Sequence, residues 1–568
     1  MKNKNVIYLM FLVLFAVVLG SCSDQLTDMN VNPNGVDPST VNPNLMLATV
    51  ITNTAAPYLN ESFDGDVAGV MQYVQKSGWS SGLNKFDWTG ERSWGGRYAV
   101  LRDLQHLYKR AGEEGMEFQQ GVAIVLRAFN FGYIADSWGD APYTKALNAP
   151  EGGQEDMFPE FDPQETIYRG IIDELKKANT LLSKSRGEYK GIDPDADLIY
   201  HGDPAQWRKF ANSLMLRYYM RVSSKLSDFA KQGIEEIISD PGTYPIFTSN
   251  EDDATMGYVG SSQNDSWPNA IAFDASHSNF DRVQLCEGFR DVLWERQDPR
   301  LGVWFNKVRI PIKVSTDYTP VADTIVDGVR YLQPDSMAAR GWVVYNKDTW
   351  VADLEAGKVL VDTMDYVGIP VGANVGDGSE WNLNPNIVQG GFNVHCSALA
   401  DMYQEAKGDL LKARLISYAE VCFILAEAAQ KGWSVGSQQS WYEKGIEASF
   451  DTWGVGDDLS AYLSVPGVAY DGSLDQIMEQ KWIANWTVAH EAWCDWRRTG
   501  LPHFTFGPTV KRDAMPIRYR YGSAEKDRNN ANYLKAVDNL EETPFTATDG
   551  KDSSWSRFWL LQGTGIPY

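Results

Sequence analysis

The sequence predicts a mainly α-helical protein, one large globular unit with an irregular, loop-rich insert and few short strands. Helical patterns occupy the chain from about residue 45 to 243 and again from about 405 to 502. From about 244 to 400, helical periodicity fades, and Gly, Pro, Asn and Asp separate short apolar runs. A chain of 568 residues is long enough to bury a sizeable core. We therefore expect a helical scaffold that carries the insert.

The N-terminus has the pattern of a lipoprotein signal peptide. Two lysines precede an apolar run from residue 6 to 19, which is shorter than a membrane span. Two small residues then lead into Cys22, as in the bacterial lipobox, in which the cysteine is lipidated and becomes the first residue. We expect residues 1–21 to be removed and residues 22–568 to remain anchored through Cys22. The alternative is an ordinary secretory signal that happens to precede a cysteine.

A tryptophan-rich loop follows the first helical pattern, which begins near residue 45. In the stretch 76–96, three tryptophans lie among glycines and polar residues without helical spacing. Tryptophan is costly to leave in water, so such a loop either folds back onto the core or presents its rings to a ligand. Both interpretations stay open, with Trp79 and Trp88 as candidates for stacking on a ligand and Asn84 as a hydrogen-bonding candidate.

Asp-Pro pairs mark the predicted starts of two later helices. Asp162-Pro163 and Asp203-Pro204 each place an aspartate at the N-cap and a proline at the first helical position. The two starts are further apart than the ~34-residue period of tetratricopeptide repeats, so their spacing alone does not establish a repeat.

The insert is predicted to contain one helix, over residues 282–296, and two short strands, in the segments WVVYN and KVLVD. The rest is mostly irregular, and irregular stretches of this length inside a compact protein are more often functional than decorative. Tyr258, Trp267 and Trp381 are therefore candidates for stacking on a ligand. The alternative is that these rings pack beneath the long loops.

Three helical patterns in a row cover residues 412–502. The last begins at a capping box of Ser473 and Gln476 and ends at Gly500, which supplies a left-handed cap. Its apolar positions recur every three or four residues, at Met478, Trp482, Trp486, Ala489, Trp493 and Trp496. An aromatic stripe at this spacing is core far more often than a binding site. This region therefore predicts scaffold.

Several strings of this region resemble the SusD/RagB nutrient-binding outer-membrane lipoproteins. They are SYAEVCFILAEAAQKGW, WYEKGIEASFDTWG and QKWIANWTVAHEAWCDWRRTGLP, and the segment from Asn30 to Asn34 matches the N-x-N-P-N start of one branch of the family. The resemblance runs over nearly the whole mature chain, and the strings occur in the expected order.

The resemblance implies both an architecture and a function. The helices are expected to form tetratricopeptide-like pairs, with ligand contacts in the loop after the first long helices and in the insert. The protein is expected to be a surface-exposed lipoprotein of the outer membrane that captures oligomeric nutrients. Its partner is expected to be a SusC-like TonB-dependent barrel, which it closes as a lid. The ligand stays open between oligosaccharide and oligopeptide.

Composition excludes some partners and indicates no catalytic chemistry. With 75 acidic and 51 basic residues, the net charge of −24 repels nucleic acid. The six histidines are scattered, and no nucleophile elbow, phosphate loop or zinc-protease motif occurs. We therefore expect a binding protein with no catalytic residues, no cofactor and no metal site. The alternatives are a surface glycosidase or peptidase of unfamiliar type and a helical scaffold without a small ligand.

Overall fold

The computed structural model is mainly helical, as the sequence predicts. It describes residues 41–78, 80–148, 152, 154–318, 321–373, 380–385 and 391–568. Within these ranges, four small sheets of two or three strands accompany the helices. None of the helices in the described ranges combines the length and the apolar character that a membrane span requires.

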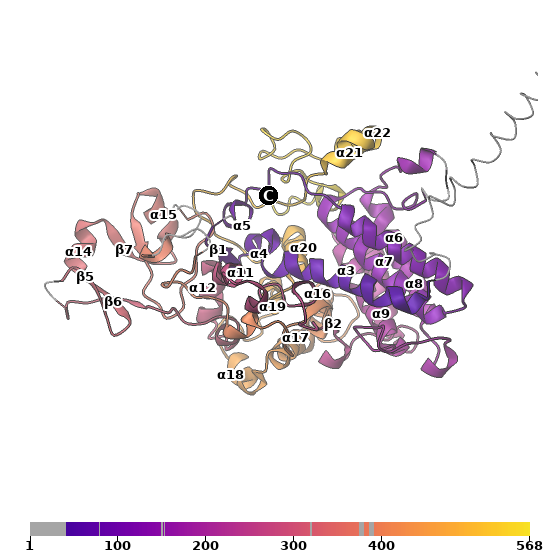
Figure 1. Ribbon diagram of the computed structural model, residues 1–568, viewed down its shortest axis with the longest axis horizontal. Coiled ribbons are helices and arrows are strands. Elements are labelled where there is room, and N and C mark those ends of the chain that lie inside the picture. Colours follow the sequence, from indigo (N-terminus) through magenta and orange to yellow (C-terminus); the bar gives the residue numbers. More distant parts are fainter. Residues whose placement is uncertain are drawn as a thin grey trace, which may run out of the picture.

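The N-terminal part of the scaffold is a row of helices, each packed against the next (Figure 1). The row comprises α6 (Gly95–Glu113), α7 (Glu117–Trp138), α8 (Gln164–Leu181), α9 (Pro204–Arg221) and α10 (Ser227–Ser239). The first long helix, α3 (Pro43–Phe63), packs on α6 and α7. It is followed by α4 (Asp66–Val70), strand β1 (Val74–Lys76) and α5 (Ser81–Lys85).

The two predicted Asp-Pro helix starts have different outcomes. Asp203 caps α9, because its side chain accepts hydrogen bonds from two backbone N–H groups of the first turn. Asp162 does not cap α8. Its carboxylate accepts hydrogen bonds from two backbone N–H groups of the preceding loop, and the Gln164 N–H at the start of α8 donates to Asp140 at 2.8 Å. The hydrogen bond at the start of α8 is therefore accepted by Asp140, which lies 24 residues before Gln164 in the sequence. A local sequence motif does not encode such a contact.

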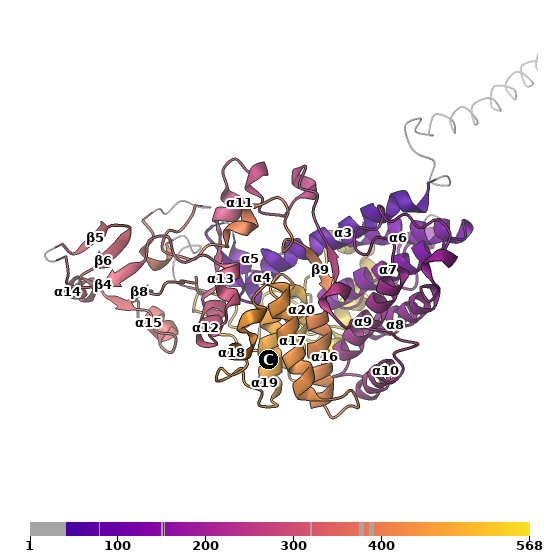
Figure 2. The ribbon, with the colours of Figure 1, turned by 90° about the horizontal axis from the view of Figure 1, so that it is seen from below.

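The C-terminal part of the scaffold consists of four main helices, seen at the lower centre of Figure 2. They are α16 (Tyr418–Gln430), α17 (Gln438–Thr452), α19 (Leu474–Ala484) and α20 (Ala489–Thr499). Ser473 caps α19 and Gly500 ends α20 with a φ of 76°, as predicted. The single helix predicted between them is two helices, because the chain turns at Thr487, whose φ is 71°. All four tryptophans of the predicted stripe are buried.

The insert combines short helices with small sheets. Its helices include α11 (Ser278–Asp281), α12 (Glu287–Glu295), α13 (Arg300–Trp304), α14 (Pro334–Ala339) and α15 (Trp350–Glu355). Strands β4 (Ile312–Val314), β6 (Val329–Leu332) and β5 (Asp323–Val326) form one sheet in that order. The predicted WVVYN and KVLVD strands are β7 (Trp342–Val344) and β8 (Val359–Val361), paired in parallel. Residues 312–361 form a lobe that projects from the helical body, at the left of Figure 1.

Two antiparallel strand pairs connect the insert to the scaffold. Strand β1 pairs with β3 (Val283–Leu285), and β2 (Ala254–Met256) pairs with β9 (Ala413–Ile416). Because β3 lies directly before α12, the first pair fixes α12 beside the N-terminal segment. One short helix, α18 (Leu459–Tyr462), precedes α19. Two others, α21 (Ser523–Arg528) and α22 (Asn530–Asp538), follow α20.

A buried ionic network joins the two parts of the scaffold. On α9, Arg217 forms two hydrogen bonds to Glu420 of α16, at 2.6 and 2.7 Å, and lies 3.4 Å from Glu491 of α20. Arg221 pairs with Glu491 and, at 3.0 Å, with Asp136 of α7. None of these five side chains is more than 4% exposed. The network therefore holds helices from both ends of the chain around one centre.

Candidate binding cleft

A cleft of about 450 Å³ opens between α12, α19 and residues 501–505. Residues 347–350 of the projecting lobe also line it. The two helical walls are connected, since Arg296, just after α12, donates hydrogen bonds of 2.8 and 3.1 Å to Glu479 of α19. The cleft therefore forms where the insert meets the C-terminal scaffold.

Aromatic rings form the base of the cleft. Trp482 is 3% exposed, donates its indole N–H to the Met71 carbonyl at 2.9 Å, and contacts Phe504 at a centroid distance of 5.4 Å. Trp350 from the lobe also lines the cleft and is 2% exposed. Because these rings are packed from beneath, the base is rigid.

A glycine allows the N-terminal segment to reach the cleft. Gln72 has a φ of 57° and donates its side-chain amide to the Thr505 carbonyl at 2.8 Å. A Cβ at Gly288, on α12, would lie 2.3 Å from the Gln72 Oε1 atom. Any side chain at position 288 would therefore require the Gln72 amide to shift.

Carboxylates dominate the walls. Seven acidic residues line the cleft against two basic ones, Arg296 and Lys347, so the lining carries an excess of negative charge. The acidic residues form two stripes with a spacing of four, Glu287, Asp291 and Glu295 on α12 and Asp471, Asp475 and Glu479 at α19, with Asp348 between them in the lining. Like charges four residues apart destabilise a helix by ~0.2–0.5 kcal/mol per pair. The two stripes therefore place carboxylates on both walls of the cleft.

At one end of the cleft, a carboxyl pair shares a tyrosine. The Tyr345 hydroxyl contacts Glu287 and lies 2.9 Å from Asp291. Arg290, which is fully buried, binds Asp291 at 2.5 Å and Asp362 at 2.8 Å. Burial, and then the charge of Asp291, raise the pKa of Glu287 above its usual range. Glu287 therefore keeps its proton to a higher pH than an ordinary glutamate, within a largely buried group that includes Tyr345.

The chemistry of the lining suits a hydrogen-bonding oligomer. Carboxylates accept hydrogen bonds from hydroxyl and ammonium groups, and Phe504, which is half-buried above the packed tryptophans, leaves part of an apolar ring at the cleft. Asp348, Asp471 and Asp475 are exposed at the cleft. Sequence analysis missed these residues, although the spacing of four in both acidic stripes was visible in the sequence.

The first group of predicted site residues comes from the N-terminal part of the chain. Cys22 and Trp79 fall outside the described residues, and Asn84 and Trp88 lie in the 76–96 loop. Asn84 is 5% exposed and is engaged with the backbone of Lys76, through hydrogen bonds of 2.9 and 2.6 Å. Trp88 is 2% exposed, with its indole N–H donated to the Gly82 carbonyl at 3.0 Å. This loop folds back onto the core at Trp88, which corrects the expectation of a free ring there.

The second group, from the insert, is also packed. Tyr258 and Trp267 meet edge to face at a centroid distance of 6.0 Å, and Trp267 is 1% exposed because Phe63 and Tyr403 cover it. Trp381 is 2% exposed and belongs to the same buried cluster as the cleft residue Trp350. The predicted stacking roles of Trp267 and Trp381 are corrected accordingly, since neither ring offers an open face. The structure brings Tyr258 and Trp267 together, but it does not unite the predicted residues in one open site.

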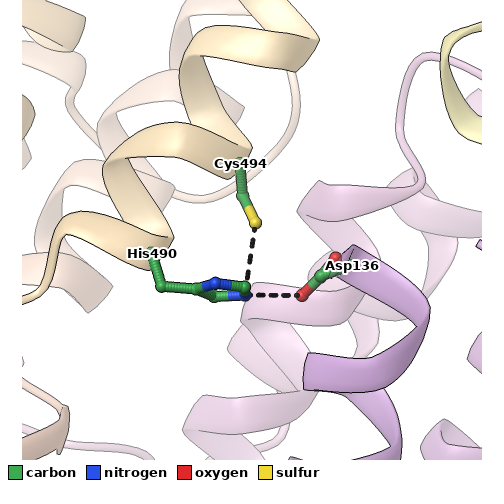
Figure 3. A group of neighbouring side chains, drawn as sticks. All are labelled: Asp136, His490 and Cys494. Atoms are coloured by element: carbon green, nitrogen blue, oxygen red, sulfur yellow. Dashed lines mark hydrogen bonds and ion pairs between the residues drawn. The ribbon is translucent and has the colours of Figure 1, made fainter. Parts of the chain in front are cut away.

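A separate cluster has the residue types of a metal site. Figure 3 shows Asp136, His490 and Cys494 converging between α7 and α20, with the His490 Nε2 atom 3.9 Å from Asp136 and 3.7 Å from the Cys494 sulfur. Two arginines occupy its surroundings: Arg221 pairs with Asp136 at 3.0 Å, and Arg497 donates to the Cys494 sulfur at 2.9 Å. Burial lowers the pKa of His490 and raises that of the Cys494 thiol. Arginine cations and a protonated thiol oppose a metal ion, so this cluster is part of the buried ionic network.

Comparisons with known proteins agree on one family. The SusD-like_2 family model, described as "Starch-binding associating with outer membrane", matches residues 34–323 and 357–522. The unmatched segment between these ranges carries β6, α14, β7 and α15 of the projecting lobe. No curated protein sequence matches the chain.

Solved structures show the same fold at low sequence identity. A SusD homolog from Bacteroides fragilis is 23% identical, with 92% of this chain and 99% of that chain covered and a TM-score of 0.66. A SusD homolog from Bacteroides thetaiotaomicron is 19% identical, with coverages of 93% and 99% and a TM-score of 0.64. A chitin-binding SusD homolog from Flavobacterium johnsoniae is 19% identical, with coverages of 92% and 99% and a TM-score of 0.66.

Proposed function

The chain belongs to the SusD-like family, and from this membership we propose that it captures oligosaccharides at the outer face of the outer membrane and delivers them to a partner transporter. The family description names starch binding and association with the outer membrane. One relative of the same fold is described as chitin-binding. We propose binding without catalysis, with the acidic cleft as the capture site.

The cleft is the observation that carries this proposal. Sugars present hydroxyl groups at their edges and apolar C–H groups on their faces, so they suit a cleft with carboxylate walls and the half-buried ring of Phe504. The base is held by buried rings, and the walls are connected through Arg296 and Glu479. A preformed site of this kind loses little ordering entropy when it binds.

The acidic lining also favours a second candidate ligand, a basic oligopeptide. The exposed carboxylates of Asp348, Asp471 and Asp475 attract ammonium and guanidinium groups and also accept hydrogen bonds from hydroxyl groups. A basic peptide would bind with a steep dependence on salt, because its affinity would come mostly from charge. A neutral oligosaccharide would bind with little dependence on salt. The salt dependence therefore separates the two ligands.

Membrane attachment and delivery complete the proposal. Cys22 is proposed to carry the lipid, which leaves the cleft-bearing unit on the membrane surface. The partner is proposed to be a SusC-like TonB-dependent barrel, with the captured oligomer enclosed between the two proteins. Co-purification of the full-length protein with a SusC-like barrel from the native outer membrane would support this arrangement, and a protein that purifies alone under the same conditions would oppose it.

Calorimetric titration of the lipid-free Cys22→Ala protein tests the capture site. We expect saturable binding of malto- or chito-oligosaccharides, with no hydrolysis product in the same mixtures. Asp348→Asn together with Asp475→Asn should weaken binding about tenfold, since each exposed carboxylate accepts a hydrogen bond to charge worth ~1.5–3 kcal/mol before compensation by water. Asp195→Asn, an exposed acid in the turn before α9, is the matched control. Equal affinities for all three proteins would remove the cleft from the proposal.

A further inference from the structure

An exposed tryptophan lies on the other side of α12 from the acidic cleft. Among the tryptophans that the structure describes, Trp294 is the one that leaves nearly half of its side chain, 48%, in solvent. It stands on the last turn of α12, next to Leu293, which is buried. Large aromatic side chains are costly to leave in water, but single exposed apolar residues are common on protein surfaces, so the case for a binding surface depends on what lies around this ring.

Trp294 forms one side of an open groove of about 660 Å³. Tyr366 lies beside it, with the ring centroids 6.4 Å apart and the planes inclined by 52°. Pro299, Leu301 and Gly302 complete the apolar lining. A Cβ at Gly302 would lie 3.3 Å from the Tyr366 hydroxyl, so the glycine leaves room for the tyrosine.

The base of this groove is rigid. After α12 the chain reverses at Gln297, whose φ is 53°, and this reversal places residues 298–302 beside Trp294. Asp298 is 4% exposed, and Arg300 binds its carboxylate at 2.6 and 2.9 Å and Ser449 of α17 at 2.7 Å. These buried bonds fix the segment against the scaffold. The aromatic pair is therefore held in place before any ligand arrives.

The groove and the acidic cleft share a residue. Glu295, on the last turn of α12, lines both, and Lys347 pairs with it from the lobe. A helix with its side chains is ~10–12 Å across, so an oligomer of several units can extend from the cleft over the end of α12. The rim of the groove offers Glu295 and Gln297, both exposed, as partners for hydroxyl groups.

We propose that Trp294 and Tyr366 form a second sugar-stacking subsite, which binds the far part of a long oligosaccharide whose near part occupies the acidic cleft. This inference rests on the proposed function and extends it, because it assigns the protein a preference for chain length. An indole face receives the C–H face of a pyranose ring, while the carboxylate and amide at the rim bind its hydroxyl edge. The two subsites act on one chain, so their contributions combine as in multivalent binding.

The test compares short and long oligosaccharides on the full-length protein in detergent. The probes are maltotriose and maltoheptaose, together with chitobiose and chitohexaose, titrated calorimetrically. In whichever series the wild type binds, Trp294→Ala should lower the affinity for the longer probe by about five- to tenfold. Its affinity for the shorter probe should be unchanged. Trp294→Tyr should restore most of the affinity. Phe158→Ala, which removes an aromatic side chain of similar exposure (41%) outside the groove, is the control and should change neither affinity.

Each outcome decides a different point. A loss confined to the longer probe supports the subsite. Unchanged affinity of Trp294→Ala for the longer probe, with the wild type binding both lengths, overturns the subsite and leaves the cleft proposal standing. Weakened association with the barrel at unchanged sugar affinity would assign Trp294 to a protein contact and overturn the subsite. Wild-type protein that binds neither series would overturn the proposed function itself.

Discussion

The buried ionic network makes a strong prediction about stability, at Glu491. This carboxylate accepts a hydrogen bond from the Tyr58 hydroxyl at 3.0 Å and pairs with Arg217 and Arg221. Glu491→Gln keeps the size of the side chain and removes its charge. The two arginines then retain Glu420 and Asp136, but the cluster carries an additional positive charge that no solvent reaches.

The expected loss is large. Removing one partner of a buried ion pair typically costs ~3–5 kcal/mol, because the remaining charge stays desolvated. A natural protein is stable by only ~5–15 kcal/mol in total. We therefore expect Glu491→Gln to lower the free energy of unfolding by ~3–5 kcal/mol, as measured by urea unfolding followed by circular dichroism at pH 7. Glu447→Gln, an exposed acid on α17, should change it by less than ~0.5 kcal/mol.

The pH dependence supplies an independent check. Burial alone would raise the pKa of Glu491, but the charges of Arg217 and Arg221 outweigh burial and hold that pKa below its usual range. A carboxylate with a lowered pKa in the folded state stabilises the protein above its usual pKa of ~4.3 and loses this contribution as the pH falls towards the lowered value. Wild-type stability should therefore fall more steeply between pH 5 and pH 3 than that of the variant. This account of the network would be refuted if Glu491→Gln lowered the free energy of unfolding by less than ~1 kcal/mol at pH 7. It would also be refuted if the stabilities of the two proteins fell equally steeply between pH 5 and pH 3.

Three further measurements test other parts of the protein. Burial and the charge of Asp291 raise the pKa of Glu287 to about 8, so the contribution of this group to stability should decline as the pH rises from ~4.3 towards that value. The thermal stability of Glu287→Gln relative to the wild type should therefore increase between pH 4 and pH 9, and a constant difference between the two proteins would contradict the raised pKa. Trp267→Ala should lower the free energy of unfolding by ~3–5 kcal/mol, because its ring is 1% exposed, and an unchanged denaturation midpoint would place the ring outside the core. Cys22→Ala should shift the protein from the membrane to the soluble fraction, and retention of the variant in membranes would contradict the lipid anchor.

The sequence predicts the scaffold well because helices leave local signals. The cap at Ser473, the left-handed end at Gly500 and the burial of the tryptophans between them all follow from neighbouring residues. The break at Thr487 was missed, because the apolar spacing of two consecutive helices continues across the turn. The helix-capping role of Asp140 was missed because it depends on a contact from another loop.

The site was harder to predict because burial is a tertiary property. Composition identified tryptophans as candidates for stacking, but Trp88 and Trp267 are covered by segments distant in sequence. Trp294 lies in a predicted helix, and the neighbouring sequence does not show that it is exposed. The segments that pack against α12 determine which of its faces is covered. The acidic stripes were visible as residues four apart, but the meeting of α12 and α19 across a cleft was not.

The projecting lobe supplies one side of the cleft from a segment that lies outside the family match. Residues 324–356, which the family model does not match, include Lys347, Asp348 and Trp350 of the cleft lining. The walls formed by α12 and α19, together with Trp482 of the base, belong to matched segments that are fixed by buried bonds. Replacement of this one segment during evolution would exchange one side of the cleft while the helical body continued to fold as before.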